Sequence, residues 1–302
     1  KLISQGNFHE AVALIKEKLP LPASIGRDCP HPCENACRRQ MVEDSISIAY
    51  LKAFAADEDM KENTFVPEVL PDTGKKVAII GGGPAGLTAA YFLRIKGHDV
   101  TIFDAMPQMG GMLRYGIPSF KLEKDVIDAE IEIIKAMGVE IKCGIEVGKD
   151  VTLDQLRAEG YKAFYIAIGC QGGKKAGIPG EDAEGVMTAV DFLRTVGADE
   201  SYGVTGKAVV VGGGNVAIDV ARTAQRCGAE SVSMFCLEPR DKMPASEEEI
   251  AEALDEDVTI DCGWGPKEIL TENGKVTGII FKRCTSVWDA EGRFAPTYDE
   301  ND

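Results

Sequence analysis

The sequence predicts an α/β fold, with two doubly wound units built on one plan and a small helical segment before them. Three observations predict it. Residues 76–104 and 206–238 each show a short apolar strand, a glycine-rich turn, a helix and a second strand. Strand-like and helix-like stretches alternate between these two repeats, which is typical of a parallel sheet. Residues 1–62 contain helical patterns and a proline-stiffened loop.

The composition excludes several classes of function. The chain has 302 residues, of which 44% are hydrophobic and 27% are charged, and its formal net charge is −16 at pH 7. This negative charge argues against nucleic acid or an anionic membrane as a partner. The longest apolar runs are strand-sized, so we expect no membrane insertion. Because the chain starts at Lys1 and stops in an acidic stretch, we expect it to be cut from a longer protein.

Helices dominate the expected structure of residues 1–62. Residues 7–18 form an amphipathic pattern, with Asn7 as N-cap and Glu10 as its capping-box partner. A second helix is expected over residues 46–57. Residues 63–75 are acidic and proline-containing, which is typical of a linker.

The loop between these helices contains three closely spaced cysteines. Cys29, Cys33 and Cys37 lie within nine residues, and Pro30 and Pro32 oppose regular helix there. Converging thiolates in a stiffened loop suit a soft metal centre such as an iron–sulfur cluster, and the alternative is three free thiols. The visible segment supplies no fourth ligand. The other six cysteines, at 143, 170, 227, 236, 262 and 284, are expected to be core thiols.

The first glycine-rich turn follows the apolar strand 77–80. Gly81, Gly83 and Gly86 have the G-x-G-x-x-G spacing, which allows a tight turn, close approach of a pyrophosphate and close packing of the next helix. That helix is expected to begin at Pro84, and its N-terminal N–H groups would face the phosphates. The second strand ends at Asp104, whose carboxylate can accept a hydrogen bond from a ribose 2′-hydroxyl. This pattern predicts dinucleotide binding.

A second glycine-rich loop, residues 108–122, can bring backbone against a large planar cofactor, and a surface loop is the alternative. A helix over 124–137, a strand over 139–143 and a helix capped by Thr152 are expected next. The run 163–169 is expected to be a buried strand that ends at Gly169.

Residues 206–238 repeat the first pattern, with Gly212, Gly214 and Ala217 in the three glycine positions. Two such units predict two dinucleotides, and a flavin and a nicotinamide are the natural pair because they exchange a hydride. Ser246 and Glu249 then indicate a capped helix, and strands are expected over 258–262 and 275–284.

Several motifs together resemble one family. They are the Cys29–Cys37 segment, VAIIGGGPAGLTAA, GGMLRYGIPSF, AIGCQ with IPGE, GGGNVAIDVART and MPASEEEI. In collinear order they resemble the small (beta) subunit of bacterial glutamate synthase. They equally resemble the large subunit of the NADH-dependent ferredoxin:NADP oxidoreductase, the N-terminal part of dihydropyrimidine dehydrogenase and partner subunits of formate dehydrogenases and hydrogenases.

The resemblance implies a helical iron–sulfur domain over residues 1–62, a linker over 63–75, a Rossmann-like FAD domain over 76–185 and a Rossmann-like NAD(P) domain over 186–302. It implies [4Fe–4S] ligands at Cys29, Cys33 and Cys37. For FAD it implies contacts at Gly81, Gly83, Pro84, Ala85, Gly86, Asp104, Gly111, Met112, Leu113, Arg114 and Gly169. For the nicotinamide dinucleotide it implies Gly212, Gly214, Asn215, Val216, Ala217, Glu238 and Arg240.

The chain departs from this family pattern in four places. The upstream cysteine-rich stretch and the C-terminal glycine-rich segment of the FAD domain are absent from these residues. Lys52 stands where many members have a cluster ligand, which puts a second cluster in doubt. Where NADPH-using members have two arginines, this chain has Leu237 and Glu238, which favours NAD(H) over NADP(H), although Arg240 is nearby.

We therefore expect an NAD(P)H-dependent flavoprotein oxidoreductase, with NADH favoured, as a subunit of a cytoplasmic redox complex. It would pass electrons between NADH, FAD, [4Fe–4S] clusters and a partner subunit or ferredoxin, with no acid or base catalyst. The alternatives are an NADPH-dependent glutamate synthase small subunit and a non-catalytic nucleotide-sensing or scaffold subunit. A disulfide reductase is disfavoured because the loop after Asp104 contains no cysteine.

Overall fold

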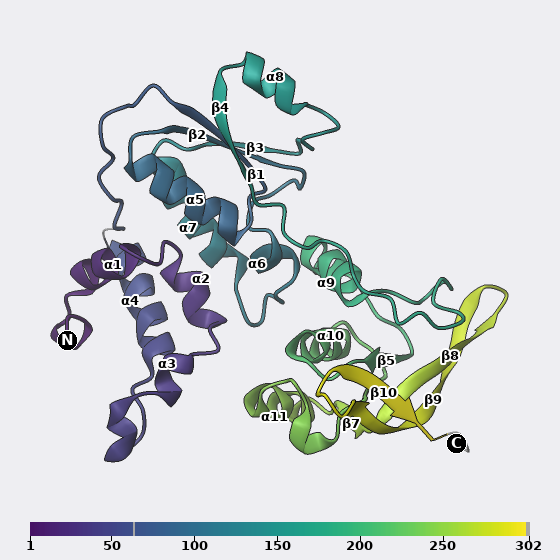
Figure 1. The fold of residues 1–302 in the computed structure, drawn as a ribbon. Helices are drawn as coiled ribbons and strands as arrows, with labels where there is room; N and C mark the ends of the chain where they lie inside the picture. Colours follow the sequence, from purple (N-terminus) through teal and green to yellow (C-terminus); the bar gives the residue numbers. More distant parts are fainter. Residues whose placement is uncertain (63, 300–302) are drawn as a thin grey trace. The chain divides into compact units, whose positions relative to one another are not determined.

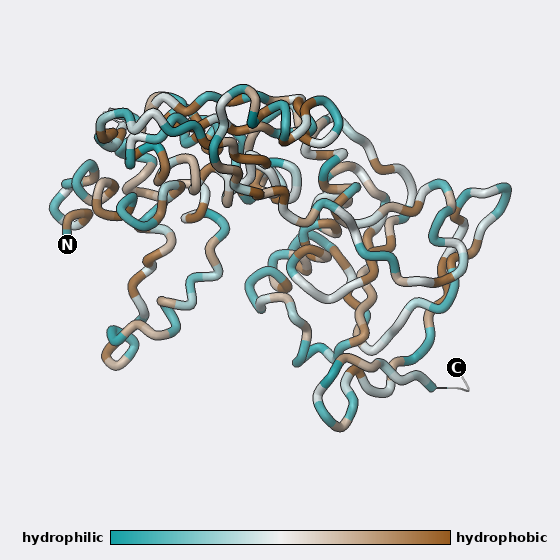
Figure 2. Tube along the Cα trace, turned by 45° about the horizontal axis from the view of Figure 1, so that its top comes forward, coloured by the Kyte–Doolittle hydropathy of each residue, from teal (hydrophilic) through white to brown (hydrophobic). Residues whose placement is uncertain are grey.

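A computed structural model describes residues 1–62 and 64–299, and the chain divides into two compact units, Lys1–Cys170 and Gln171–Asp302 (Figure 1). Asn63, the first residue of the expected linker, and the last three residues of the expected NAD(P) domain lie outside the described residues. Hydrophobic segments, brown in Figure 2, lie inside each unit, whereas the outlying loops are mostly teal. No helix of the described part combines the length and the apolar character that crossing a bilayer requires.

The first unit begins with short helices around a small apolar cluster of Val12, Ala23, Ala55 and Ala56. The helices are η1 (Ile3–Gln5), α1 (Phe8–Lys16), α2 (Pro22–Arg27), α3 (Pro32–Asn35), η2 (Arg38–Met41) and α4 (Ile48–Glu62).

Two details of this helical part differ from expectation. The prediction of a capping box at Asn7 is wrong. Within the described residues the Asn7 side chain makes no capping hydrogen bond, because its backbone (φ −86°, ψ 67°) is not in the extended conformation of an N-cap. The second helix begins at Ile48 rather than 46 and continues to Glu62, so its last turn includes polar residues that the sequence analysis left out.

A four-stranded parallel sheet forms the rest of the first unit, in the order β3-β2-β1-β4. This order is that of a doubly wound fold, as predicted. The strands are β1 (Lys76–Ile80), β2 (Asp99–Asp104), β3 (Glu140–Cys143) and β4 (Tyr161–Ile166), and the helices are α5 (Pro84–Ile95), α6 (Met112–Tyr115), α7 (Lys124–Ala136) and α8 (Leu153–Ala158). Thr152 caps α8 with a complete capping box, as predicted.

The expectation that β4 is buried is wrong. Tyr161 is buried, but most of the strand is exposed, including Tyr165 at 45% and Ile166 at 56%. The physical reason is that β4 is the edge strand and pairs on one side with β1. The apolar run therefore predicted the strand correctly but did not predict how much of the strand is buried.

The expected linker is attached to the sheet unit within its described residues, 64–75. The Leu70 amide donates to the carbonyl of Ile95 at 2.9 Å, and the Thr73 amide donates to Gly97 at 3.0 Å. These bonds fix the segment to the end of α5.

The second unit contains a parallel sheet in the order β5-β6-β7 and an antiparallel sheet in the order β10-β9-β8. The strands of the first sheet are β5 (Lys207–Val211), β6 (Ser231–Cys236) and β7 (Thr259–Cys262). The helices of the same part are α9 (Ala189–Ala198), α10 (Asn215–Arg226), η3 (Arg240–Lys242) and α11 (Glu247–Asp255). The second sheet comprises β8 (Trp264–Glu272), β9 (Lys275–Trp288) and β10 (Phe294–Tyr298). Neither α9 nor the antiparallel pairing was predicted from the sequence, whereas the strand expected over 275–284 is present as part of β9.

The division between the units lies earlier than the expected domain boundary after residue 185. Residues 171–185 group with the second unit. Two hydrogen bonds explain this: the amide of Ile269 donates to Pro179, and the amide of Glu184 donates to Gly274, both at 2.9 Å. The segment thus pairs with the β8–β9 hairpin.

The six scattered cysteines are less buried than expected. Cys236 is buried, Cys170 is exposed, and Cys143, Cys227, Cys262 and Cys284 are half-buried. Cys170 lies beyond the end of β4, in a segment without regular secondary structure.

Candidate functional site: two glycine turns and a cysteine loop

The first glycine turn joins β1 to α5 at a very close approach of backbone. Gly81 has φ +107°, and a Cβ on it would lie 2.3 Å from the carbonyl oxygen of Ala167. A Cβ on Gly86 would lie 1.9 Å from the carbonyl oxygen of Gly81. A side chain at either position would therefore force the turn open, so close packing requires glycine at both.

The middle glycine of the motif, Gly83, is different. It is the N-cap of α5 with φ −77°, and its nearest neighbour for an added Cβ is the Cα of Gly111, at 3.6 Å. Pro84 follows as the first helical residue and Ala85 as the second. The open side of Gly83 lies beside the free N–H groups of a 12-residue helix, which is the arrangement that binds a pyrophosphate. The residues therefore fit a dinucleotide.

Asp104 lies beside this turn at the end of β2 and is 9% exposed. One carboxylate oxygen accepts from the Gly82 amide at 2.5 Å, and the other accepts from the Met106 amide at 2.7 Å. Both oxygens keep acceptor capacity, because a carboxylate has about four lone-pair sites. A ribose hydroxyl can therefore donate to a carboxylate whose position is already fixed.

The loop of residues 108–116 lies directly on the glycine turn. The Gly110 amide donates to the carbonyl of Gly82 at 2.9 Å, and Gly111 has φ +53° next to Gly83. Met112 then starts the short helix α6, in which Leu113 is buried. The loop therefore packs its backbone against the turn, while its contact with a planar cofactor stays a prediction.

Arg114 has a local structural role. Its side chain is buried, its Nε donates to the carbonyl of Met109 at 2.7 Å, and its Nη2 pairs with Asp128 on α7. Asp128 could not be found from the sequence, because a pairing across 14 positions between a loop and a helix leaves no local signal. Contact of Arg114 with FAD stays a prediction.

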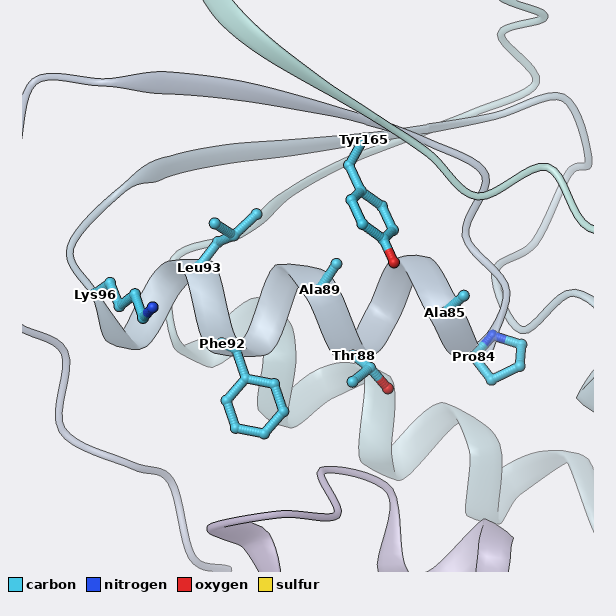
Figure 3. A pocket seen from close by; sticks show the side chains of 8 residues that line it. All are labelled: Pro84, Ala85, Thr88, Ala89, Phe92, Leu93, Lys96 and Tyr165. Carbon is cyan, nitrogen blue, oxygen red and sulfur yellow. The ribbon is translucent and has the colours of Figure 1, made fainter.

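The carboxyl end of β4 also approaches the first turn. The Ala167 amide donates to the carbonyl of Ile80 at 2.8 Å, and Gly169 follows with φ +64°. On the outer face of α5, a groove of about 590 Å³ is lined mainly by apolar side chains (Figure 3). Its lining includes Pro84, Ala85 and Tyr165 from β4. The groove thus runs along the side of α5 from its first residues, at the glycine turn, to Lys96 just after its last.

The second glycine turn joins β5 to α10 and has the same design. Gly212 has φ +142°, and a Cβ on it would lie 3.3 Å from the Cβ of Ala217. Ala217 therefore still allows close packing, as expected from the sequence. Gly214 is the N-cap of α10, and in the described part of the chain a Cβ placed there would meet open space.

The first residues of α10 face the segment before α11. The side-chain oxygen of Asn215 accepts from the Ser246 amide at 3.0 Å, and the carbonyl of Gly213 accepts from the Ala245 amide at 3.0 Å. Val216, in the first turn of α10, is 54% exposed. The MPASEEE segment thus helps to hold the turn in place.

Glu238 follows β6 and lies beside the second turn. Its Oε2 is 3.1 Å from the position of a Cβ on Gly213, and the Oδ2 of Asp104 is 3.0 Å from the same position on Gly82, although Glu238 lies two residues beyond the register equivalent of Asp104. Arg240 makes two bonds to Glu247, at 3.2 and 3.0 Å, and this pairing raises the pKa of its guanidinium. The second turn therefore has a carboxylate beside it, and the nearest arginine that follows is paired with another carboxylate.

The three clustered cysteines are free thiols on the segment around α3 and η2, with Cys33 exposed and Cys29 and Cys37 half-buried. Hydrogen bonds from the backbone at Ile46 and Arg39 lower the pKa of the Cys37 thiol. As a donor set, three thiols suit iron–sulfur ligation. Their side chains do not converge, since no group of three His, Cys, Asp or Glu residues in the described part can hold a metal ion.

Comparisons with known proteins agree with this architecture. A family model described as "Pyridine nucleotide-disulphide oxidoreductase" matches residues 75–287, and one described as "Dihydroprymidine dehydrogenase domain II, 4Fe-4S cluster" matches residues 1–64. The structure of FprA from Mycobacterium tuberculosis in complex with NADPH is similar in fold, with a TM-score of 0.64 and 21% identity over 76% of this chain and 68% of that one.

Curated relatives are more similar in sequence. The beta subunit of NADP(+)-dependent formate dehydrogenase from Moorella thermoacetica is 41% identical over 92% of this chain and 43% of its own length. The NAD-dependent dihydropyrimidine dehydrogenase subunit PreT of Escherichia coli O157:H7 is 40% identical over 90% of this chain and 65% of its own. The small chain of glutamate synthase [NADPH] from Escherichia coli K12 is 37% identical over 97% of this chain and 65% of its own.

The chain thus spans less than half of the first of these relatives and about two thirds of the other two. The family resemblance inferred from the motifs is confirmed. With two glycine turns of matching geometry and a family match that covers most of its residues, the chain belongs to the pyridine nucleotide-disulphide oxidoreductase family.

Proposed function

We propose that this chain is an NAD(P)H-dependent flavoprotein oxidoreductase subunit that passes electrons between NADH, FAD, [4Fe–4S] clusters and a partner subunit or ferredoxin. One observation supports it most: each unit presents an open glycine N-cap beside a carboxylate, Gly83 with Asp104 and Gly214 with Glu238. Each pair offers helix N–H groups to a pyrophosphate and a carboxylate to a ribose.

The side chains have binding and orienting roles in this proposal. A bound flavin supplies hydride exchange with a nicotinamide and one-electron exchange with an iron–sulfur centre. The chain fixes the Asp104 carboxylate, keeps the loop of residues 108–116 on the first turn through the Gly110 amide, and holds the second turn through Asn215. None of these roles needs a proton to move, so we assign no acid or base catalyst.

NADH is the favoured nicotinamide cofactor in the proposal. A glutamate beside the second turn would repel a 2′-phosphate, and the nearest arginine after it, Arg240, is paired with Glu247. The names of the relatives include both NAD-dependent and NADP-dependent proteins, so this preference rests on the residues of this chain.

The proposal also assigns the domains, the partners and the cellular location. We assign residues 1–62 to an iron–sulfur domain that carries Cys29, Cys33 and Cys37, residues 76–185 to FAD binding and residues 186–302 to NAD(P) binding. The relatives are named as subunits or chains of larger redox enzymes. We accordingly propose a cytoplasmic complex with other redox subunits or ferredoxin.

An anaerobic titration tests this function. Full-length protein loaded with FAD is mixed with NADH and, separately, with NADPH, while flavin absorbance is followed. Rapid bleaching by NADH is the expected result. Preference for NADPH would favour a glutamate synthase-type small chain, and bleaching by neither would favour a nucleotide-sensing or scaffold subunit.

A further inference from the structure

Two free cysteines lie side by side at the carboxyl ends of β6 and β7. Cys236 is the last residue of β6, Cys262 is the last residue of β7, and the two are register partners in the parallel sheet. Their sulfur atoms are 3.7 Å apart, and the Cys262 sulfur lies 3.8 Å from the Sδ atom of Met243. Three sulfur atoms from separate segments thus meet at one edge of the sheet.

This edge of the sheet carries the second glycine turn. Cys236 is the register equivalent of Asp104, since each follows the residue that pairs with the last residue before its turn. The Cβ and Sγ atoms of Cys236 lie 2.9 and 3.4 Å from the position of a Cβ on Gly213, within the turn. A thiol therefore occupies the place that the Asp104 carboxylate has beside the first turn.

The cysteine pair also holds the backbone of Glu238. The Cys236 thiol donates to the Glu238 carbonyl at 3.5 Å, and the amide of Gly263, which follows Cys262, donates to the same oxygen at 3.2 Å. The carboxylate of Glu238 lies beside the second turn. A change in the bonding of the two sulfur atoms therefore reaches both the turn and this carboxylate.

The spacing of the two strands permits a disulfide. Register partners on neighbouring strands lie roughly 4.8 Å apart at Cα, within the range of about 4.4–6.8 Å that disulfides span. This separation is shorter than the most common one, which favours a bond that reductants reopen. Closing the bond brings the sulfur atoms from 3.7 Å to about 2.05 Å and removes the proton that Cys236 donates to Glu238.

We propose that Cys236 and Cys262 form a reversible oxidation site, where a peroxide converts the two thiols to a disulfide and thereby weakens binding of the nicotinamide dinucleotide at the second turn. This inference rests on the proposed function. Binding weakens because the Glu238 carbonyl loses one of its two donors and because Cys236 shifts beneath Gly213.

The two thiols react in a fixed order. Cys236 is 2% exposed, and burial together with the neighbouring Cys262 thiol raises the pKa of Cys236 to about 12, so the half-buried Cys262 reacts first. The Cys262 sulfur attacks hydrogen peroxide, the O–O bond breaks, and a sulfenic acid and one water form. The Cys236 sulfur then displaces the hydroxyl group from Cys262, which leaves as a second water with the Cys236 proton. Two thiols lose two electrons in total, and the peroxide gains them.

The first readout detects the bond itself. Full-length protein loaded with FAD is treated with hydrogen peroxide, freed of the peroxide, alkylated and digested for mass spectrometry. We expect a peptide pair linked through Cys236 and Cys262, which dithiothreitol separates. The absence of this pair, or a link from either cysteine to another one, would overturn the proposal.

The second readout is the dissociation constant for NAD⁺ before oxidation, after it and after reduction by dithiothreitol. We expect oxidation to weaken binding by at least about fivefold and reduction to restore it, while flavin content stays constant. Reversal by dithiothreitol distinguishes the disulfide from oxidation of Met243, because a dithiol does not reduce a methionine sulfoxide.

Three serine variants complete the test. Cys236→Ser and Cys262→Ser should each bind NAD⁺ equally well before and after peroxide treatment. Cys227→Ser is the matched control, since Cys227 is a half-buried thiol at the end of α10 in the same unit, and it should respond as wild type does. If Cys236→Ser fails to fold because its site is buried, the half-buried Cys262→Ser decides. Weaker binding after peroxide treatment of Cys262→Ser would overturn the proposal.

The two proposals fail in different ways. Reduced wild-type protein that neither binds NAD⁺ nor is bleached by NADH would overturn the proposed function, and the effect of the disulfide on binding with it. Reduced protein that binds NAD⁺, and binds it equally well once the disulfide has formed, would overturn this inference alone.

Discussion

Replacing Gly83 by alanine separates the binding role of the glycine turn from its packing role. The Gly83 backbone, at φ −77° and ψ −176°, suits any residue, and an added Cβ would make an ordinary contact of 3.6 Å with Gly111. The change should therefore leave the free energy of unfolding within about 0.5 kcal/mol of wild type. The new methyl group would occupy the space where a pyrophosphate approaches the backbone, so FAD affinity should fall at least about tenfold.

Gly86→Ala is the contrasting variant. Its Cβ would lie 1.9 Å from the Gly81 carbonyl oxygen, whereas real Cβ atoms essentially never approach a neighbour within 3.0 Å. The turn must therefore open by about 1 Å, at a cost of about 1–3 kcal/mol in the free energy of unfolding. Gly214→Ala is the matched control in the second unit, and it should weaken NADH binding while flavin content stays unchanged.

The assay combines thermal or urea unfolding of the cofactor-free protein with the flavin content and FAD affinity of each variant. The expected pattern is that Gly83→Ala folds normally and loses flavin, and that Gly86→Ala loses both stability and flavin. If Gly83→Ala bound FAD with wild-type affinity, the first turn would not face a pyrophosphate, and the reasoning would be refuted.

Three further predictions concern charge, pH and iron. Glu238→Arg should raise the ratio of NADPH to NADH specificity by about tenfold or more, because a cation replaces the repelling carboxylate; steady-state kcat/KM values check this, and an unchanged ratio contradicts it. Burial raises the pKa of the Glu130 carboxyl, so the folded state binds that proton more tightly than the unfolded chain does. The free energy of unfolding of wild type relative to Glu130→Gln should therefore fall as pH rises from the ordinary glutamate pKa through the raised one; urea unfolding at several pH values measures it, and a rise would contradict it. Cys37→Ser should lower the bound iron and the cluster spectrum per chain, and unaltered iron content would remove Cys37 from the ligand set.

Features set by neighbouring residues could be predicted from the sequence. The spacing of Gly81, Gly83 and Gly86 predicts a tight turn and close helix packing, and the structure has both. Thr152 with Gln155 forms the capping box of α8. Such features could be predicted because steric limits and hydrogen bonds within a few residues determine them.

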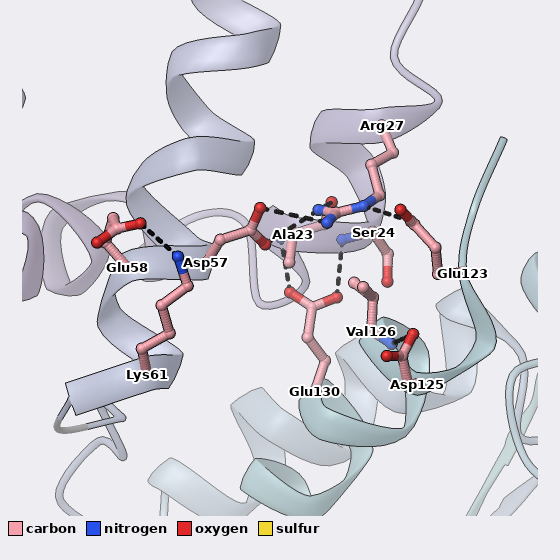
Figure 4. A network of polar contacts seen from close by, with 10 residues as sticks. All are labelled: Ala23, Ser24, Arg27, Asp57, Glu58, Lys61, Glu123, Asp125, Val126 and Glu130. Atoms are coloured by element: carbon pink, nitrogen blue, oxygen red, sulfur yellow. Dashed lines mark hydrogen bonds and ion pairs between the residues drawn. The ribbon is translucent and has the colours of Figure 1, made fainter.

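Features set by distant contacts could not be predicted. Glu130 caps a helix 107 positions away (Figure 4); its spacing from Ile127 and Ile134 places it on the buried face of α7, but nothing in its own helix indicates its partner. The run at 163–169 indicated burial, but its place at the sheet edge leaves Tyr165 and Ile166 exposed. Asn7 has the right residue type for a cap and the wrong backbone conformation. Each of these outcomes depends on tertiary packing.

A crystal structure of the protein grown with FAD and NAD⁺ tests the central claim most directly. The account predicts one pyrophosphate at Gly83 with its ribose on Asp104, and a second at Gly214 with its ribose on Glu238. A dinucleotide bound elsewhere, or either turn left empty at saturating ligand, would contradict it.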